Sequence, residues 1–162
     1  MAEREPEQPD RLERPDRVER DVFIAARPEI VFGFLTESEK FVRWMGIEAR
    51  LEARSGGAFR VNVDGANIAA GRFVEVTPYR RVVFTWGWEG GEALPPGAST
   101  VEITLTESTN GTLLRLVHSG LSVELAPSHG AGWDHFMARL ECRAGGGDPG
   151  PDPWIKDDAA AG

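Results

Sequence analysis

The sequence predicts an α+β fold in which a curved antiparallel sheet of about seven strands packs against a long C-terminal helix. Three observations support this prediction. Apolar residues recur with period two through residues 47–118, which is typical of half-buried strands. The dipeptides Asp64-Gly65 and Asn110-Gly111 interrupt this pattern and favour tight hairpins. Apolar residues then return at helical spacing over residues 133–140, which indicates one amphipathic helix.

The chain begins with a predicted strand over Val18–Ala26, followed by two short helices. Pro28 suits the first turn of the first helix, because its missing N–H group would have no partner there anyway. Thr36–Glu39 matches a capping box, so we expect the helix to stop and a second helix to start there. That second helix is predicted to end at Gly46 and to carry Phe41, Val42, Trp44 and Met45.

The predicted strands that follow cover residues 47–52, 59–63, 69–76, 80–89, 101–106 and 113–118. Because short connections join them, neighbouring strands should pair antiparallel into a strongly curved sheet. Pro127 opens the final helix, and its apolar stripe consists of Trp133, Phe136, Met137 and Leu140. This helix is the only long amphipathic element, so we expect it to cover the concave face of the sheet.

Composition indicates one domain over residues 18–144 between two disordered tails, residues 1–17 and 145–162. Both tails are rich in charged residues, Pro or Gly and poor in apolar side chains. The net charge of −8 and the lack of a basic block argue against nucleic-acid binding. The sequence shows no signal peptide and no apolar run of about 18 residues, so we expect no membrane span. The single Cys142 excludes an internal disulfide and favours a reducing, cytoplasmic location.

The segment 80–91 is the most informative part of the sequence. Val82, Phe84, Trp86 and Trp88 share one face of the predicted strand, which should oppose the apolar stripe of the final helix. Such an aromatic wall, next to the flexible Glu89-Gly90-Gly91, suits a pocket for an apolar ligand. A closed aromatic core fits the same pattern, and both interpretations stay open.

The histidines are candidates for the polar groups of such a pocket. His118 falls on the same predicted strand face as Leu114 and Leu116, so it should point into the interior. It then either orients a ligand or acts as a general base, or it is a hydrogen-bonded core histidine. His129, His135 and Cys142 lack the spacing of a metal site, and we predict no metal and no cofactor.

A family resemblance rests on short motifs in chain order: Ala26–Phe32, Phe41–Gly46, Gly56–Arg60, Gly71–Trp86, Gly111–Leu114, His118–Leu121 and Gly132-Trp133. Over residues 18–143 they resemble the START-like (SRPBCC) helix-grip superfamily. They are most similar to the branch homologous to the C-terminal domain of the activator of a heat-shock-protein ATPase. The resemblance implies a helix-grip fold. Members of the superfamily bind hydrophobic small molecules, cyclise polyketides or act as accessory domains.

The function we predict is non-enzymatic binding of a small hydrophobic or aromatic ligand between the sheet and the C-terminal helix. The expected lining consists of Phe84, Trp86, Trp88, His118, Trp133 and Met137, together with Phe59 and Phe73. One alternative is a co-chaperone or protein-interaction module, which predicts a packed interior and an exposed apolar patch. The other is a polyketide-cyclase-like enzyme, which predicts a titratable group with a shifted pKa in a cavity. We expect a monomer or a homodimer.

Overall fold

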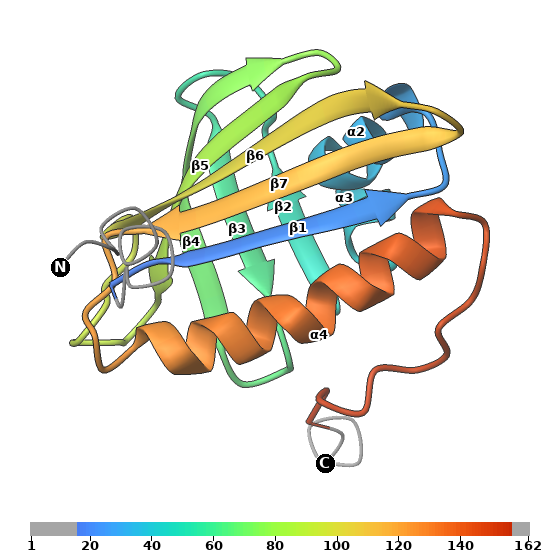
Figure 1. Cartoon of the computed structure of the whole chain (residues 1–162). Helices are drawn as coiled ribbons and strands as arrows, with labels where there is room; N and C mark the ends of the chain where they lie inside the picture. Colours follow the sequence, from blue (N-terminus) through green and yellow to red (C-terminus); the bar gives the residue numbers. More distant parts are fainter. Residues whose placement is uncertain (1–15, 157–162) are drawn as a thin grey trace, which may run out of the picture.

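A single antiparallel sheet curves around one long helix (Figure 1). The computed structural model describes residues 16–156. The strand order is β1-β7-β6-β5-β4-β3-β2. The strands are β1 (Val18–Ile24), β2 (Glu48–Leu51), β3 (Ala58–Asn62), β4 (Ile68–Thr77), β5 (Arg81–Trp88), β6 (Ser99–Ser108) and β7 (Gly111–Ser119). Helix α4 (Ala126–Ala144) lies along the sheet. The predicted α+β helix-grip fold is therefore confirmed, including its seven strands.

The two short helices after β1 are α2 (Pro28–Thr36) and α3 (Ser38–Phe41). The predicted second helix is shorter than expected, since residues 42–44 form hydrogen-bonded turns. The predicted capping box is also wrong. The Thr36 hydroxyl donates back to the carbonyl oxygen of Phe32 at 2.8 Å, and Glu37 takes the N-cap position of α3 without a side-chain cap. The indole of Trp44 instead fixes this region, because its Nε1 donates to the Phe34 carbonyl at 2.8 Å.

Strand pairing determines which side chains meet on the concave face. In the β5–β6 register Trp86 pairs with Ser99, and in the β6–β7 register Val101 pairs with His118. Ser99 and His118 therefore lie close to Trp86 although they are far apart in the sequence. A bulge in β4 between Phe73 and Glu75 interrupts the β4–β5 pairing. Bulges bend a strand and increase its twist, which favours the curvature of the sheet.

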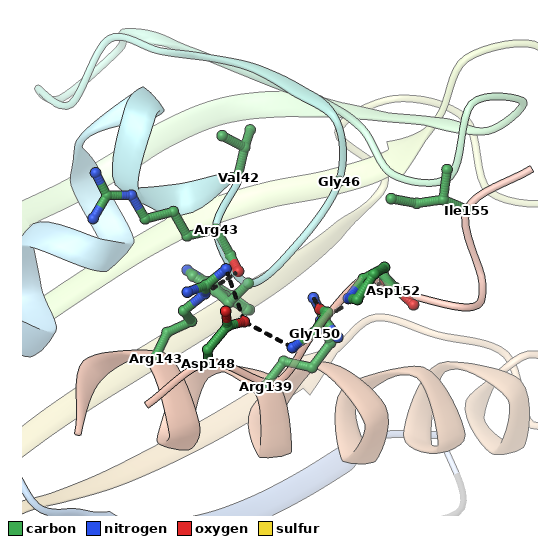
Figure 2. A pocket seen from close by; sticks show the side chains of 11 residues that line it. Val42, Arg43, Gly46, Arg139, Arg143, Asp148, Gly150, Asp152 and Ile155 are labelled. Carbon is green, nitrogen blue, oxygen red and sulfur yellow. Dashed lines mark hydrogen bonds and ion pairs between the residues drawn. The ribbon is translucent and has the colours of Figure 1, made fainter. Parts of the chain in front are cut away.

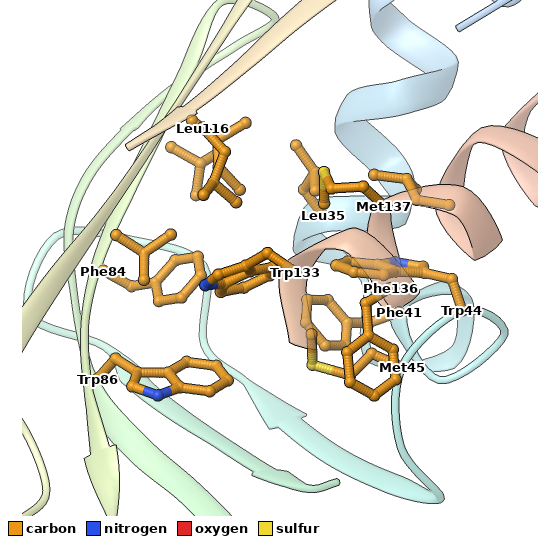
Figure 3. Close-up of a cluster of buried hydrophobic side chains, with 14 of the residues drawn as sticks. Leu35, Phe41, Trp44, Met45, Phe84, Trp86, Leu116, Trp133, Phe136 and Met137 are labelled. Atoms are coloured by element: carbon orange, nitrogen blue, oxygen red, sulfur yellow. The ribbon is translucent and has the colours of Figure 1, made fainter. Parts of the chain in front are cut away.

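The core fills the space between the concave face and α4 (Figure 3). Phe59 and Phe84 stack with ring centroids 4.0 Å apart, and Phe73 meets Phe84 edge to face at 6.0 Å. The predicted apolar stripe of α4 is buried throughout, at Trp133, Phe136, Met137 and Leu140. Trp133 meets the aromatic face of β5 as expected, with its ring centroid 5.4 Å from that of Trp86.

After α4 the chain turns back toward the sheet, and we call residues 148–156 the C-terminal segment. Asp152 is buried there, and its Oδ1 accepts hydrogen bonds from His135 Nε2 and from the backbone N–H of Trp154, both at 2.9 Å. The Trp154 ring stacks on His135 at 3.7 Å. The backbone N–H of Lys156 donates to the carbonyl oxygen of Asp64 at 2.6 Å, which ties the segment to the β3–β4 turn.

The structure describes only part of the two tails that the sequence predicts to be disordered. Residues 1–15 and 157–162 lie outside the described part of the chain. Within the described part, residues 148–156 of the expected C-terminal tail contact α4 and the β3–β4 turn, as given above. None of the helices that the structure describes is long and apolar enough to cross a membrane.

Candidate functional site

A cavity of about 630 Å³ opens between the end of β5 and the first half of α4, and we call it the tryptophan cavity. Four of the five tryptophans of the chain line it: Trp86, Trp88, Trp133 and Trp154. Aliphatic and aromatic side chains complete much of the wall, contributed by Met45, Val63, Leu94, Leu125 and Phe136. This volume and this predominantly apolar lining are typical of small-molecule sites.

His118 lies behind the inner wall of the cavity and is fully buried. The Trp133 indole Nε1 donates to His118 Nδ1 at 3.0 Å, so the neutral imidazole carries its proton on Nε2. His118 Nε2 lies 2.8 Å from Ser99 Oγ and donates to it, and Ser99 Oγ donates to the Trp86 carbonyl at 2.7 Å. Both ring nitrogens of His118 are therefore occupied by protein groups.

The electrostatic environment keeps His118 neutral. Burial lowers its pKa from 6.5 to about 3, and the nearby His129 adds to the lowering. The two imidazoles meet edge to face with centroids 5.3 Å apart. Because a general base near neutral pH needs an accessible nitrogen and a pKa near the working pH, His118 is poorly suited to that role. Its geometry is that of a hydrogen-bonded core histidine, one of the two interpretations left open by the sequence.

His129 forms a second tryptophan–histidine pair at the cavity wall. The Trp88 indole Nε1 donates to His129 Nε2 at 3.1 Å, and His129 Nδ1 donates to the Leu125 carbonyl at 2.9 Å. Burial lowers the pKa of His129, although its hydrogen bond to Leu125 partly offsets the effect. His129 is thus also held neutral in one tautomer, with both nitrogens engaged.

Trp86 is the exception among the buried indoles. Its side chain is 4% exposed, and its Nε1 is buried with no hydrogen-bond partner in the described part of the chain. The indole groups of Trp44, Trp88 and Trp133 all donate to a protein atom. Figure 3 shows the Trp86 nitrogen on the ring edge that faces away from Phe84 and Trp133. A buried indole N–H usually finds an acceptor, so Trp86 is a lining residue whose buried donor is unsatisfied among residues 16–156.

The residues predicted as ligand-binding divide into three sets. Trp86, Trp88 and Trp133 line the tryptophan cavity. His118 lies directly behind them, with its ring centroid 5.8 Å from that of Trp86 and 6.1 Å from that of Trp133. The remaining four lie outside the lining and pack in the closed core: Phe59, Phe73, Phe84 and Met137.

Several lining residues had no signal in the sequence. Leu94 comes from the 90–97 loop and Met45 from the turn after α3, and neither position follows a periodic pattern. Trp154 was noticeable as the lone aromatic residue of a polar tail, but its partner His135 could not be identified without the fold. His129 precedes the apolar stripe of α4, and its position in the sequence gives no sign that it lines a cavity.

A second hollow of about 450 Å³ lies on the other side of the C-terminal segment (Figure 2). Four of its five charged side chains contact other side chains or the backbone: Arg139, Arg143, Asp148 and Asp152. Arg143 lies 3.5 Å from Asp148, and its Nε donates to the Arg43 carbonyl at 3.1 Å. Arg139 donates to the Gly150 carbonyl at 2.9 Å. These contacts hold the C-terminal segment against α4.

No group of three or more acidic, histidine or cysteine side chains suited to a metal ion occurs among residues 16–156.

Comparison with solved structures supports the fold and the family. An AHSA1-like protein from Rhizobium etli shares 50% identity over 86% of this chain and 88% of its own, with a TM-score of 0.69. CalU16 from Micromonospora echinospora shares 28% identity over 90% of this chain and 82% of its own, with a TM-score of 0.69. The Aha1 dimer from Colwellia psychrerythraea shows the same fold at 17% identity, with a TM-score of 0.70, covering 81% and 98% of the two chains. A search of curated proteins finds no match.

The family comparison covers nearly the whole domain. Residues 25–144 match the family described as Activator of Hsp90 ATPase homolog 1-like protein. The match begins directly after β1 and runs to the last residue of α4, so it includes strands β2 to β7, both short helices and most of the cavity wall. The resemblance expected from the sequence is confirmed, and the chain belongs to the Activator of Hsp90 ATPase homolog 1-like family within the START-like helix-grip proteins.

Proposed function

We propose that this protein binds a small, mainly aromatic molecule in the tryptophan cavity. The observation that carries the proposal is the unpartnered indole N–H of Trp86, which is buried in the wall of an apolar cavity of about 630 Å³. Burying a polar group without a hydrogen bond costs free energy. A ligand carbonyl or ether oxygen beside Trp86 would remove that cost.

The rest of the lining supports an aromatic ligand. Trp88 and Trp133 approach Trp86 with ring centroids 5.3 and 5.4 Å away. Both have their own N–H groups occupied by histidines, so they present mainly ring surface to the cavity. Aromatic rings of this kind favour offset or edge-to-face contacts with another ring. The fixed histidines also hold the tryptophan rings in place, so little ordering is needed on binding.

Binding without catalysis fits this arrangement better than a reaction at His118. That imidazole has both nitrogens engaged and a pKa near 3, so it can neither accept a proton readily nor reach a ligand. Asp64 and Glu92 are the carboxylates of the lining. Asp64 already accepts three hydrogen bonds within its own turn, from the backbone of Ala66 and Asn67 and from the Asn67 side chain.

The test uses prodan, an uncharged naphthalene with a ketone oxygen and a fluorescence spectrum that reports its surroundings. Titration into the protein should shift prodan emission to shorter wavelength and give saturable binding. Trp86→Phe keeps an aromatic ring but removes the N–H group, so it should weaken prodan binding by roughly tenfold. Trp44→Phe is the matched control, because it also removes one buried tryptophan N–H but lies outside the cavity lining.

Two results would contradict the proposal. One is a wild-type protein that binds no prodan and shows no rise in melting temperature with it, since a ligand of the native state must stabilise that state. The other is equal affinity of wild type and Trp86→Phe for prodan, which would show that the unpartnered N–H does not face the ligand.

A protein partner is the second candidate. The family description refers to an activator of the Hsp90 ATPase. Phe23 on β1 and Leu113 on β7 pair directly across the sheet and are 41% and 48% exposed, which gives a small apolar surface on the convex face. If this surface contacts a chaperone, Phe23→Ser combined with Leu113→Ser should abolish stimulation of a bacterial Hsp90 ATPase while leaving prodan binding intact. The absence of any stimulation by the wild type would exclude this activity.

A further inference from the structure

The ionised side chains that line the tryptophan cavity are of one sign. Asp64 and Glu92 line it, and none of its described lining residues is Lys or Arg. The two histidines of the region, His118 and His129, both have lowered pKa values because they are buried, so they bring no positive charge near neutral pH. An anionic ligand would therefore lose its water of hydration without meeting a cationic side chain of the lining.

Asp64 remains ionised in this setting. Burial alone would raise its pKa, but the hydrogen bonds from Asn67 and Ala66 outweigh that effect, and the pKa of Asp64 is lowered. The charge of Lys156 contributes to the same lowering, so part of the Asp64 charge is balanced by the C-terminal segment. Glu92 differs, because it is exposed and takes part in none of the ion pairs among residues 16–156. Glu92 is therefore the uncompensated charge at the cavity rim.

The tryptophans add attraction for a cation. The faces of indole rings carry negative electrostatic potential, and tryptophan gives the strongest cation–π contacts of the aromatic residues. Trp88 is half-buried, and Trp154 is 45% exposed, so both lie on the solvent side of the cavity. Trp86 and Trp133 lie deeper, at 4% and 3% exposure. The cavity thus has an inner apolar part with Trp86 and Trp133 in its wall and an outer part with ring faces and carboxylates.

We propose that the ligand is an aromatic molecule that carries a protonated amine, with its ring against the inner tryptophans and its ammonium group at the rim beside Glu92. This inference rests on the proposed function, because it names the chemical class that the same cavity selects. The selection acts by two means. The rim attracts the ammonium group, and the two carboxylates repel a ligand carboxylate or sulfonate.

The experiment compares three naphthalenes that differ only in the group on C1: 1-naphthylmethylamine, 1-naphthalenemethanol and 1-naphthoate. Isothermal titration at pH 7 and low salt should give the tightest binding for the amine, an intermediate value for the alcohol and the weakest for the carboxylate. We expect about a tenfold difference in Kd between the amine and the carboxylate. Added sodium chloride should reduce this difference, because Glu92 is exposed.

A matched pair of variants assigns the preference to the rim. Glu92→Gln should reduce the ratio of the two Kd values, that of the carboxylate to that of the amine, severalfold. Glu107→Gln, which removes an equally exposed carboxylate outside this cavity, should leave it unchanged. Equal binding of amine and carboxylate, or a preference that survives Glu92→Gln, would overturn the inference. If prodan binds while the amine does not, this inference is wrong and the proposed function stands, whereas failure of prodan and all three naphthalenes removes both.

Discussion

The indole N–H of Trp133 on α4 donates to Nδ1 of His118 on β7, with 3.0 Å between the two nitrogens. This bond links the helix to the sheet at the back of the tryptophan cavity. It also fixes the imidazole tautomer, and through it the donation from Nε2 to Ser99. Because every residue in this series of hydrogen bonds is buried, a change of protonation at His118 has consequences for the stability of the whole domain.

The first prediction concerns acid pH. The folded-state pKa of His118 is about 3, below the ordinary value of 6.5. Between these two values the unfolded chain binds the proton and the folded chain does not, so the free energy of unfolding falls as the pH drops below about 6.5. The loss should approach about 1.4 kcal/mol per pH unit from His118 alone, with a further part from His129. Urea unfolding at pH 7.5, 6 and 5 measures this loss in the free energy of unfolding.

A variant isolates the contribution of His118 to this pH dependence. His118→Gln has no titrating ring, so its free energy of unfolding should fall less steeply between pH 6 and 5 than that of the wild type. It should also be less stable than the wild type at pH 7.5, because an amide cannot reproduce both hydrogen bonds of the imidazole. Identical slopes for the two proteins would show that His118 is not buried and neutral in the folded state.

The second prediction concerns Ser99. Its hydroxyl accepts from His118 Nε2 and donates to the Trp86 carbonyl, and its side chain is 2% exposed. Ser99→Ala leaves both partners without a hydrogen bond, so the free energy of unfolding should fall by about 2 kcal/mol. Ser119→Ala on β7 is the control, because the described structure gives that half-buried hydroxyl no hydrogen bond. A Ser99→Ala protein as stable as Ser119→Ala would contradict the hydrogen-bond chain.

The third prediction compares two glycines beside the cavity. A Cβ on Gly87 would lie 1.7 Å from the Pro95 carbonyl oxygen, so Gly87→Ala must displace the loop that crosses β5 there. We expect a loss of at least about 2 kcal/mol in the free energy of unfolding. Gly132 lies within α4, and a Cβ there meets no atom within 4 Å. Gly132→Ala should therefore stabilise the protein by about 0.5–1 kcal/mol through helix propensity.

Thermal and urea unfolding of both alanine variants test this comparison. The two substitutions add the same methyl group, so the opposite signs depend on the space around each glycine and on the helix propensity gained at position 132. A Gly87→Ala variant with wild-type stability would mean that the 90–97 loop is not packed on β5. In that case Leu94 would not form part of the cavity wall.

The sequence was sufficient for the order of elements because period-two and helical patterns are local. The aromatic face of β5 and the stripe of α4 could be recognised, and their opposition followed from the single long helix. Which aromatic residues close the core and which line a cavity could not be predicted. Phe84 and Trp86 share one strand face, yet Phe84 stacks on Phe59 at 4.0 Å and Trp86 faces the cavity. That difference depends on where α4 departs from the sheet.

The side-chain contacts between segments far apart in the chain could not be predicted from the sequence either. The pattern placed His118 inside, but nothing local identified Trp133 and Ser99 as its partners. The C-terminal segment shows the same limit, since a composition rich in Gly, Pro and Asp gave no sign that Asp152 would be buried. Its burial depends on His135, which lies 17 positions earlier on α4 and supplies a donor at 2.9 Å.

The last prediction concerns that segment as a wall of the cavity. Trp154 lines the cavity and is held by stacking on His135, with centroids 3.7 Å apart and planes 6° apart, and by contact with Phe136 at 5.8 Å. Trp154→Ala should speed prodan dissociation and weaken its binding about three- to tenfold, because ring contact and cover are both lost. Stability should change by less than about 1 kcal/mol, since the ring is half exposed.

The neighbouring Ile155 provides the control for this change. Ile155 lines the second hollow rather than the tryptophan cavity. The substitution Ile155→Ala therefore truncates a side chain of the same segment without removing a ligand contact. Stopped-flow measurement of prodan release should therefore show a faster rate for Trp154→Ala than for Ile155→Ala. Equal rates in the two variants would mean that prodan does not touch the Trp154 ring. The cavity would then be bounded by β5, the β3–β4 turn, the turn that carries Met45, the 90–97 loop and α4. The ring of Trp154 would serve only to fasten residues 148–156 to His135.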